Sequence, residues 1–142
     1  MAANAHLTRC YDFCASHRLH DGRMSEEDNQ RIYGKCNNPW GHGHNYRLEV
    51  TVAGPVSEST GMVVNITDLD RVVMAEVIEP FDHRNLNTDV ASFRERVPTS
   101  ENLLLEIATR LSQRWAREGF DGKLEKLRLQ ETGKNFFEYH LP

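Results

Sequence analysis

The sequence lacks the features that would assign it to a membrane-spanning, exported or nucleic-acid-binding class. Its longest purely apolar runs, such as residues 103–105, are far shorter than the ~20 residues that span a bilayer. Residues 1–10 lack the basic and then apolar segments of a secretion signal. The formal net charge is −4, whereas a nucleic-acid binder normally carries a basic stripe. We therefore expect a soluble protein that is not exported.

Cysteine is also scarce, and its pattern restricts the cellular compartment. The chain has 3 cysteines, an odd number, and none of them forms a C-x-x-C pair. Neither a disulfide framework nor a cysteine zinc finger is therefore predicted. A reducing compartment fits this pattern best, and we expect a cytoplasmic protein.

The overall composition, with 39% hydrophobic and 27% charged residues, is that of an ordinary globular protein. A chain of 142 residues can bury roughly 68–70% of its unfolded surface around one core. We expect a single domain over residues 1–142, with residues 1–7 as a flexible tail.

Alternating hydrophobicity predicts strands in both halves of the chain. Residues 8–17 place four side chains of one parity on a less polar face: Tyr11, Phe13, Ala15 and His17. Residues 46–52 alternate in the same way, and continuing their parity backwards puts His42 and His44 on the buried side. After the loop "GPVSEST", the run "GMVVNI" is expected to pair antiparallel with that strand. Residues 127–131 and 136–140 are expected to form a hairpin around "TGKN".

Two helices are predicted between these strands. The first is capped by Thr67, has Asp68 and Asp70 in its first turn and stops at Pro80. Its apolar stripe consists of Leu69, Val72, Val73 and Val77. The second begins at Thr99 or Ser100 and ends at Gly119. Residues 20–32 are highly charged and without a period, so we expect a long loop there. This order predicts an α+β fold, a four-stranded antiparallel sheet with both helices on one face.

Three histidines are candidate metal ligands. His42 and His44 are two residues apart on a strand and therefore point the same way. This pair alone is also compatible with ordinary polar residues near a strand end. His17 ends the apolar face of another strand, and its addition favours a metal site. Imidazoles favour zinc or another late first-row metal, and three protein ligands leave a position open, as catalytic sites do. We interpret His6, His20 and His140 as surface residues.

Cys36 has three alternative explanations. It is a fourth zinc ligand, which would make the site structural, or a thiol that the metal and Lys35 activate as base or nucleophile. The third alternative is a small buried hydrophobic residue, but the neighbouring Asn37, Asn38 and Gly41 indicate an exposed turn.

Other polar residues also allow two interpretations each. Asp82 and His83 form either a loop salt bridge or a pair in which the carboxylate orients the imidazole for proton transfer. Glu131 shares the parity of Leu127 and Leu129, so its carboxylate faces the interior and needs hydrogen-bond donors. It either bonds to the core or binds a guanidine-like N–H edge. Arg18 and Lys35 are either anion ligands or solvated surface charges.

Six segments together resemble one family. "CASHRL", "YGKCNNPWGHGHNY", "GMVVNITDLD", "PFDHRNLN", "PTSEN" and "QETGKNFFEY" occur in the order and at about the spacing of the 6-pyruvoyltetrahydropterin synthases. The resemblance implies the tunnelling fold, in which three subunits join their sheets into a barrel and two trimers stack as a hexamer. It also implies release of triphosphate from 7,8-dihydroneopterin triphosphate, with internal redox rearrangement to 6-pyruvoyltetrahydropterin, on the route to tetrahydrobiopterin.

The same resemblance implies a role for each matched residue. His17, His42 and His44 match the zinc ligands, Cys36 matches the proton-abstracting thiol, and Glu131 matches the pterin anchor. Asp82 and His83 match a relay pair that reaches the thiol from a neighbouring subunit. A segment near the pterin pocket is matched by Thr99, Ser100 and Glu101.

Two rival functions stay open at this point. The first is 6-carboxytetrahydropterin synthase, which uses the same substrate but whose cysteine lies closer to the H-x-H pair than Cys36 does here. The second is a non-catalytic binding module stabilised by zinc, with Cys36 closing a tetrahedral site.

Overall fold

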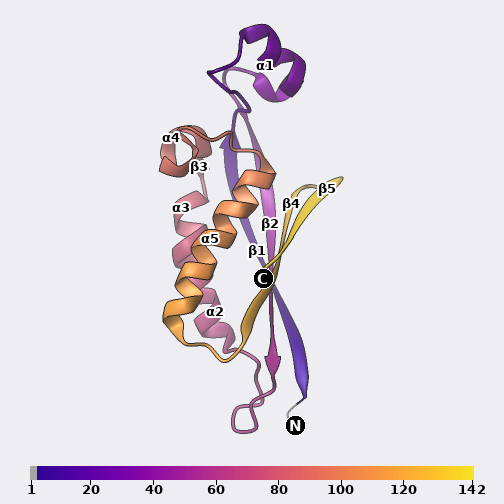
Figure 1. The fold of residues 1–142 in the computed structure, drawn as a ribbon, viewed down its shortest axis with the longest axis vertical. Coiled ribbons are helices and arrows are strands. Elements are labelled where there is room, and N and C mark those ends of the chain that lie inside the picture. Colours follow the sequence, from indigo (N-terminus) through magenta and orange to yellow (C-terminus); the bar gives the residue numbers. More distant parts are fainter. Residues whose placement is uncertain (1–2) are drawn as a thin grey trace.

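The protein is a twisted sheet with helices on one face (Figure 1). The structure, a computed structural model, describes residues 3–142. The elements in chain order are β1 (Asn4–His17), α1 (Glu26–Tyr33), η1 (Gly34–Asn37), β2 (His42–Pro55), α2 (Ile66–Val73), η2 (Met74–Ile78), α3 (Glu79–Phe81), β3 (Arg84–Asn85), α4 (Leu86–Asp89), η3 (Ala91–Phe93), α5 (Ser100–Glu118), β4 (Lys123–Thr132) and β5 (Asn135–His140).

The sheet has five strands in the order β3-β1-β2-β4-β5. Strands β1, β2, β4 and β5 pair antiparallel, but β3 pairs parallel with β1, at Ala15 with Arg84 and Ser16 with Asn85. The predicted four-stranded antiparallel sheet is therefore wrong in detail, because the sheet is mixed and has one more strand. This two-residue strand is too short to leave a period in the sequence.

The buried face of the sheet carries the predicted parity. Tyr46, Leu48, Val50 and Val52 are fully buried, and Phe13, Ala15 and His17 are buried on β1. Figure 1 shows α2, α3 and α5 along this face, whereas α1 lies beyond the end of the long β1–β2 hairpin. The predicted α+β fold is confirmed, as is the prediction that both principal helices cover the same face of the sheet.

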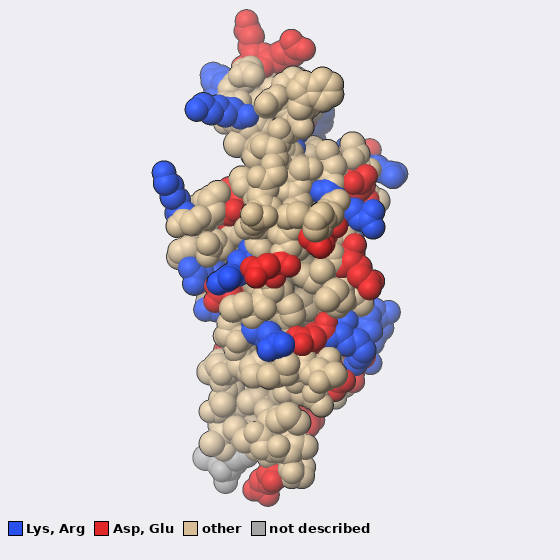
Figure 2. Space-filling view, turned by 180° about the vertical axis from the view of Figure 1, so that it is seen from behind, with Lys and Arg blue, Asp and Glu red and all other residues tan. Residues whose placement is uncertain are grey.

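The opposite face of the sheet is polar and carries ion pairs between neighbouring strands. Asp12 and Arg47 are opposite each other in the register, and Arg47 Nε lies 3.2 Å from the Asp12 carboxylate. Arg128 pairs with Glu49 at 3.4 Å. In the view from behind, basic and acidic side chains lie next to one another across the middle of the molecule (Figure 2).

The second predicted helix is confirmed at both ends. The side chain of Thr99 accepts a hydrogen bond from Asn102 N at 3.1 Å, and Gly119 ends α5 with a left-handed φ of 70°.

The first predicted helix needs two corrections. Asn65, not Thr67, is the N-cap, because its side chain accepts from Thr67 N. Pro80 does not stop the helix, which continues through η2 and α3 to Phe81. The stretch η2 is a π-helix, and such a widened turn accommodates a proline that lacks an N–H.

Three further expectations are wrong. The run "GMVVNI" is not a strand, because β4 pairs with the edge of β2 that it was expected to occupy. Within the expected loop 20–32, α1 begins after the N-cap Ser25. Of the expected tail 1–7, residues 1–2 lie outside the described residues, and β1 already begins at Asn4, whose register partner is Pro55.

Between residues 3 and 142, no helix is both long and apolar enough to cross a membrane.

Candidate metal centre and active site

Three imidazoles converge where β1 ends and β2 begins. In the register, His17 is paired with His42, and Ala15 with His44. The ring centroids lie 4.7 Å apart for His17 and His42, 5.0 Å for His17 and His44, and 4.8 Å for His42 and His44. One ring nitrogen from each histidine lies within 4.8 Å of the others. The three histidines that strand parity predicted to share a site therefore do lie together.

A glycine turn makes this convergence possible. Gly41 precedes His42 and has a φ of +72°, a conformation that favours glycine. A Cβ at this position would lie 2.7 Å from the carbonyl oxygen of His17. Only a residue without a side chain allows β2 to start this close to the end of β1.

The protonation state of His17 suits a metal ligand. Its Nδ1 lies 2.7 Å from the carbonyl oxygen of Pro98, and because a carbonyl can only accept, Nδ1 carries the proton. Nε2 of His17 is then unprotonated and has a free lone pair. It lies 3.1 Å from His42 Nε2. Burial lowers the pKa of His17 to about 4, although the bond to Pro98 acts in the opposite direction. His17 is thus neutral at pH 7 and held by an outer partner, as metal-bound histidines are.

His44 gives the clearest indication that the cluster fits a metal ion. Its Nε2 is buried and has no hydrogen-bond partner among the described residues, and a buried polar atom without a partner is costly. Its closest acidic neighbour, Glu131 Oε2, is 4.0 Å away, beyond hydrogen-bond distance. Burial lowers the pKa of His44, and Glu131 opposes this. The three imidazoles together fit a late first-row metal ion.

Glu131 lies beside the imidazoles at the end of β4 and has the predicted donors. Its carboxylate accepts hydrogen bonds from the hydroxyl of Ser100 and from Asn135 Nδ2 at 3.1 Å. Burial tends to raise the pKa of Glu131, but these two donors and His44 outweigh it and lower the pKa. Glu131 is therefore an ionised carboxylate at neutral pH with oxygen atoms that face the site.

Of the segment 99–101, only Ser100 touches Glu131. Ser100 is buried, whereas the hydroxyl of Thr99 serves as the N-cap of α5. Glu101 is exposed in the first turn of that helix.

Cys36 lies in η1, whose main chain is fastened to the end of β1. Leu19 N donates to the Cys36 carbonyl at 2.9 Å, and Asn37 Nδ2 donates to the Leu19 carbonyl at 2.8 Å. The Cys36 side chain is partly exposed. Its thiol is not part of the three-histidine cluster, which disfavours a fourth ligand from this chain.

Asp82 and His83 form the predicted pair, by a route that the sequence did not show. His83 has a φ of 59°, and this left-handed conformation turns its ring back so that Nδ1 lies 3.0 Å from Asp82 Oδ2. The other oxygen, Oδ1, accepts from Cys14 N at 2.9 Å. This main-chain bond is the chief cause that lowers the pKa of Asp82, with His83 adding to it against the effect of burial.

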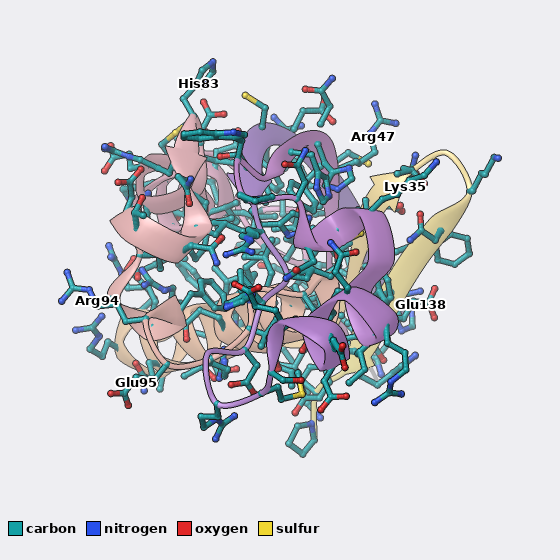
Figure 3. The ribbon with its side chains drawn as sticks, turned by 90° about the horizontal axis from the view of Figure 1, so that it is seen from above. Lys35, Arg47, His83, Arg94, Glu95 and Glu138 are labelled. Carbon is teal, nitrogen blue, oxygen red and sulfur yellow. The ribbon has the colours of Figure 1, made fainter. Side chains whose placement is uncertain are left out.

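The thiol near this pair within one chain is Cys14, not Cys36. Ligand atoms of Cys14, Asp82 and His83 lie within 4.8 Å of one another, and His83 N donates to the Cys14 carbonyl at 2.6 Å. In the view from above, His83 and Lys35, the neighbour of Cys36, project from well-separated parts of the molecule (Figure 3). Cys36 is not part of the Cys14–Asp82–His83 cluster, so its thiol does not meet the Asp82–His83 pair within one chain.

The sequence missed Cys14 and Pro98 as neighbours of the site. Cys14 has the parity opposite to Ala15 and His17, and its contact with Asp82 depends on β3, which left no signal. Pro98 reaches His17 through a main-chain oxygen, which carries no sequence signature. The two candidate anion ligands differ in position. Arg18 lines a pocket beside the site, whereas Lys35 does not line that pocket.

Comparisons with known proteins show which proteins the chain is similar to. The profile of the family described as 6-pyruvoyl tetrahydropterin synthase matches residues 6–142. A 6-pyruvoyl tetrahydrobiopterin synthase from Poecilia reticulata is 44% identical over 135 residues, which cover 94% of this chain and 88% of that protein. The Homo sapiens protein of the same name is 41% identical, over 95% of this chain and 90% of that protein.

A solved structure supports the fold as well. The Caenorhabditis elegans 6-pyruvoyl tetrahydropterin synthase superposes with a TM-score of 0.91 at 36% identity. The match covers 99% of this chain and 98% of that one.

Proposed function

The chain belongs to the 6-pyruvoyl tetrahydropterin synthase family, and from this premise we propose that it converts 7,8-dihydroneopterin triphosphate to 6-pyruvoyltetrahydropterin with release of triphosphate. It is then a carbon–oxygen lyase acting on a phosphate, as its relatives' names indicate. The observation that carries the proposal is the convergence of three imidazoles beside an ionised, donor-fixed carboxylate.

His17, His42 and His44 would hold a zinc ion. Imidazole nitrogen is a preferred zinc ligand, and a site with three protein ligands leaves a coordination position for the substrate. A zinc ion bound there would supply Lewis acidity to the hydroxyl groups of the substrate side chain. The orphaned Nε2 of His44 supports this assignment.

Glu131 would orient the pterin ring. A pterin presents a guanidine-like edge of N–H donors, and a carboxylate is the acceptor that matches two parallel donors. The carboxylate is already ionised and held by Ser100 and Asn135, so binding costs little reorganisation. Thr99 and Glu101 flank Ser100 at the start of α5, and we assign them to the rim of the same pocket.

Cys36, Asp82 and His83 would move the protons of the rearrangement. The Cys36 thiolate takes a proton from a side-chain carbon of the substrate, and the Asp82–His83 pair accepts and returns protons at the neighbouring oxygen. Because the Asp82–His83 pair does not meet Cys36 within one chain, the pair would come from a neighbouring subunit. A shared site of this kind requires an oligomer, and we assign this role to the tunnelling-fold barrel and the homohexamer that the family resemblance implies.

Neither rival function gains support. The carboxytetrahydropterin enzyme is disfavoured by the six-residue step from Cys36 to His42, and a structural zinc module by the position of Cys36 outside the histidine cluster. Mass spectrometry of the product distinguishes the first rival, because the pyruvoyl side chain and the carboxylate differ in mass.

Replacing Cys36 tests the proposal directly. We expect Cys36→Ala to retain zinc at the wild-type level and to lose turnover by at least about a hundredfold, because a proton-transfer group contributes on the order of 10² to 10⁴. Zinc content is measured by elemental analysis and product by mass spectrometry on the same sample.

Cys10→Ala is the matched control, because Cys10 is exposed on β1 and is not part of either cluster. It should leave zinc content and turnover unchanged. A Cys36→Ala protein that loses zinc together with stability would show that the thiol is a structural ligand and would refute the assignment.

A further inference from the structure

A pocket of about 760 Å³ adjoins the histidine cluster. Its walls come from residues 18–23, 39–41, 85–88 and 93–98. Four arginines line it: Arg18, Arg23, Arg94 and Arg96. The acidic residues in its walls are Asp21 and Glu95, so arginines outnumber carboxylates by two, whereas the whole chain has a net charge of −4. We call it the arginine pocket.

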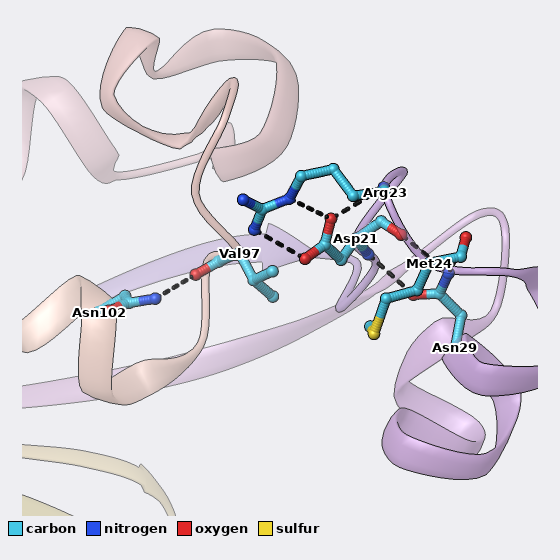
Figure 4. A network of polar contacts seen from close by, with 6 residues as sticks. All are labelled: Asp21, Arg23, Met24, Asn29, Val97 and Asn102. Carbon is cyan, nitrogen blue, oxygen red and sulfur yellow. Dashed lines mark hydrogen bonds and ion pairs between the residues drawn. The ribbon is translucent and has the colours of Figure 1, made fainter.

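Two of these arginines are held in place by the protein. Asp21 accepts from Arg23 Nε at 3.0 Å and from its terminal nitrogen at 2.9 Å. The Arg23 side chain thereby extends from its loop toward the segment that contains Val97 (Figure 4). Arg96 donates to the Asn102 carbonyl at 3.1 Å and lies over the ring of Phe93.

The other two arginines have no carboxylate partner among residues 3–142. Arg18 is fixed only through Nε, which donates to the Asn37 carbonyl at 3.0 Å. Arg94 is exposed and forms no ion pair with a described residue. Their terminal nitrogens are available to an anion, and a guanidinium binds phosphate oxygens in pairs.

The arginine pocket is connected to the imidazoles at three points. Arg18 directly follows His17, and Gly41 directly precedes His42. Pro98, a third wall residue, accepts the hydrogen bond from His17. Glu131, in contrast, approaches the cluster through His44 and does not line the pocket. The carboxylate of Glu131, the three imidazoles and the arginine pocket thus follow one another in space, with the imidazoles in the middle.

We propose that the arginine pocket binds the triphosphate of the substrate. This inference rests on the proposed function, because the order of the three sites matches the order of the substrate's parts. The ring would lie at Glu131, the side-chain hydroxyls at the imidazoles and the phosphates among the arginines. Arg18 and Arg94 are then residues that distinguish a triphosphate from an unphosphorylated pterin, and Arg23 adds positive charge to the same pocket.

Binding of inorganic tripolyphosphate to the zinc-loaded protein tests the inference without turnover. By calorimetry at low salt, Arg94→Ala should weaken the affinity about five- to tenfold, as expected for one partly exposed charge-assisted contact. The double variant Arg23→Ala/Arg94→Ala should weaken it further. Zinc content is checked after each titration, because tripolyphosphate is itself a chelator.

Arg117→Ala is the matched control. Arg117 is exposed in the last turn of α5, so this substitution removes the same charge at a position outside the pocket. It should bind tripolyphosphate as the wild type does. Equal affinity in the wild type and the double variant would overturn the inference.

Kinetics separates this inference from the proposed function. With dihydroneopterin triphosphate, Arg94→Ala should raise KM about five- to tenfold with a smaller effect on kcat, while unphosphorylated dihydroneopterin should bind equally to both proteins. Absence of turnover in the wild type would refute the proposed function, whereas normal turnover with an unchanged KM in the double variant would refute only the arginine pocket.

Discussion

Among single residues, His17 has the most constrained position of the candidate site. Pro98 fixes its tautomer from one side, and the start of β2 fixes its ring from the other. A histidine that is buried, neutral and oriented by a carbonyl has lost most of its conformational freedom before any ligand arrives. Metal binding to such a residue costs little further entropy.

Ser100 is the residue that we expect to position the pterin anchor. Ser100→Ala removes one of the two donors to Glu131 and leaves its carboxylate less fixed. Because a hydrogen bond to a charged group contributes about 1.5–3 kcal/mol, KM should rise by roughly tenfold or more. Steady-state kinetics with zinc analysis measures this, and zinc content should not change.

Ser112→Ala provides the comparison, since Ser112 is exposed on the same helix. An unchanged KM in Ser100→Ala would mean that Glu131 does not depend on this hydroxyl for substrate binding.

The sequence could predict which residues share a face, but not every contact. Parity along β1 and β2 was enough to bring His17, His42 and His44 together. The Asp82–His83 pair needed a left-handed residue that no pattern indicates, because a positive φ is uncommon in residues other than glycine. The contact of Cys14 with Asp82 joins residues 68 positions apart and depends on the unpredicted strand β3.

At the scale of elements, Asp70 links β1 to α2 through a local network. Its carboxylate accepts from Arg9 Nε at 2.8 Å and from the Tyr11 hydroxyl at 2.7 Å. The hydrogen bond from Arg9 is the largest cause that lowers the pKa of Asp70, burial opposes it, and the bond from Tyr11 lowers the pKa further. A carboxyl with a lowered pKa contributes stability above its ordinary pKa and loses that contribution as the pH falls through its value in the folded protein.

Tyr11→Phe should therefore destabilise the protein in a pH-dependent way. At pH 7 we expect the free energy of unfolding to fall by about 1 kcal/mol, at the lower end for a bond to a charged group because Asp70 is partly exposed. The difference from the wild type should decrease as the pH falls below the ordinary carboxyl pKa of about 4 and through the lowered pKa of Asp70. Urea unfolding at several pH values measures both.

Tyr139→Phe is the control, because the Tyr139 hydroxyl makes no hydrogen bond within the described part of the chain. It should show no such pH dependence. A Tyr11→Phe difference that persists unchanged at pH 3 would show that Asp70 is not the partner that matters.

Elements with a full set of local signals were predictable. The helix α5 combined an N-cap, an apolar stripe and a C-terminal glycine, and local and tertiary preferences agreed. The helix α1 has an N-cap and three acidic residues in its first turn but buries only Asn29, so it has no apolar stripe to recognise. "GMVVNI" has strand-like residues, yet both edges of β2 are already paired.

For the whole molecule, the main consequence of the proposed function is that one chain alone would not form a complete active site. Cys36 and the Asp82–His83 pair lie in different parts of one chain, so we expect them to meet only across subunits. A mixture of the inactive variants Cys36→Ala and His83→Ala, unfolded together and refolded, should regain roughly a quarter of wild-type activity, because random assembly pairs intact halves at that frequency.

The two variants refolded separately and then combined without exchange are the control and should stay inactive. If the mixed assemblies are also inactive while light scattering shows normal hexamers, the shared-site arrangement is wrong.

The central claim is that His17, His42 and His44 bind one metal ion, and the most direct test is anomalous diffraction at the zinc edge from crystals of the purified protein. We expect one anomalous peak per chain, at about 2.0–2.1 Å from a ring nitrogen of each of the three histidines. A protein that is fully active and shows no peak among these three nitrogens would contradict the account.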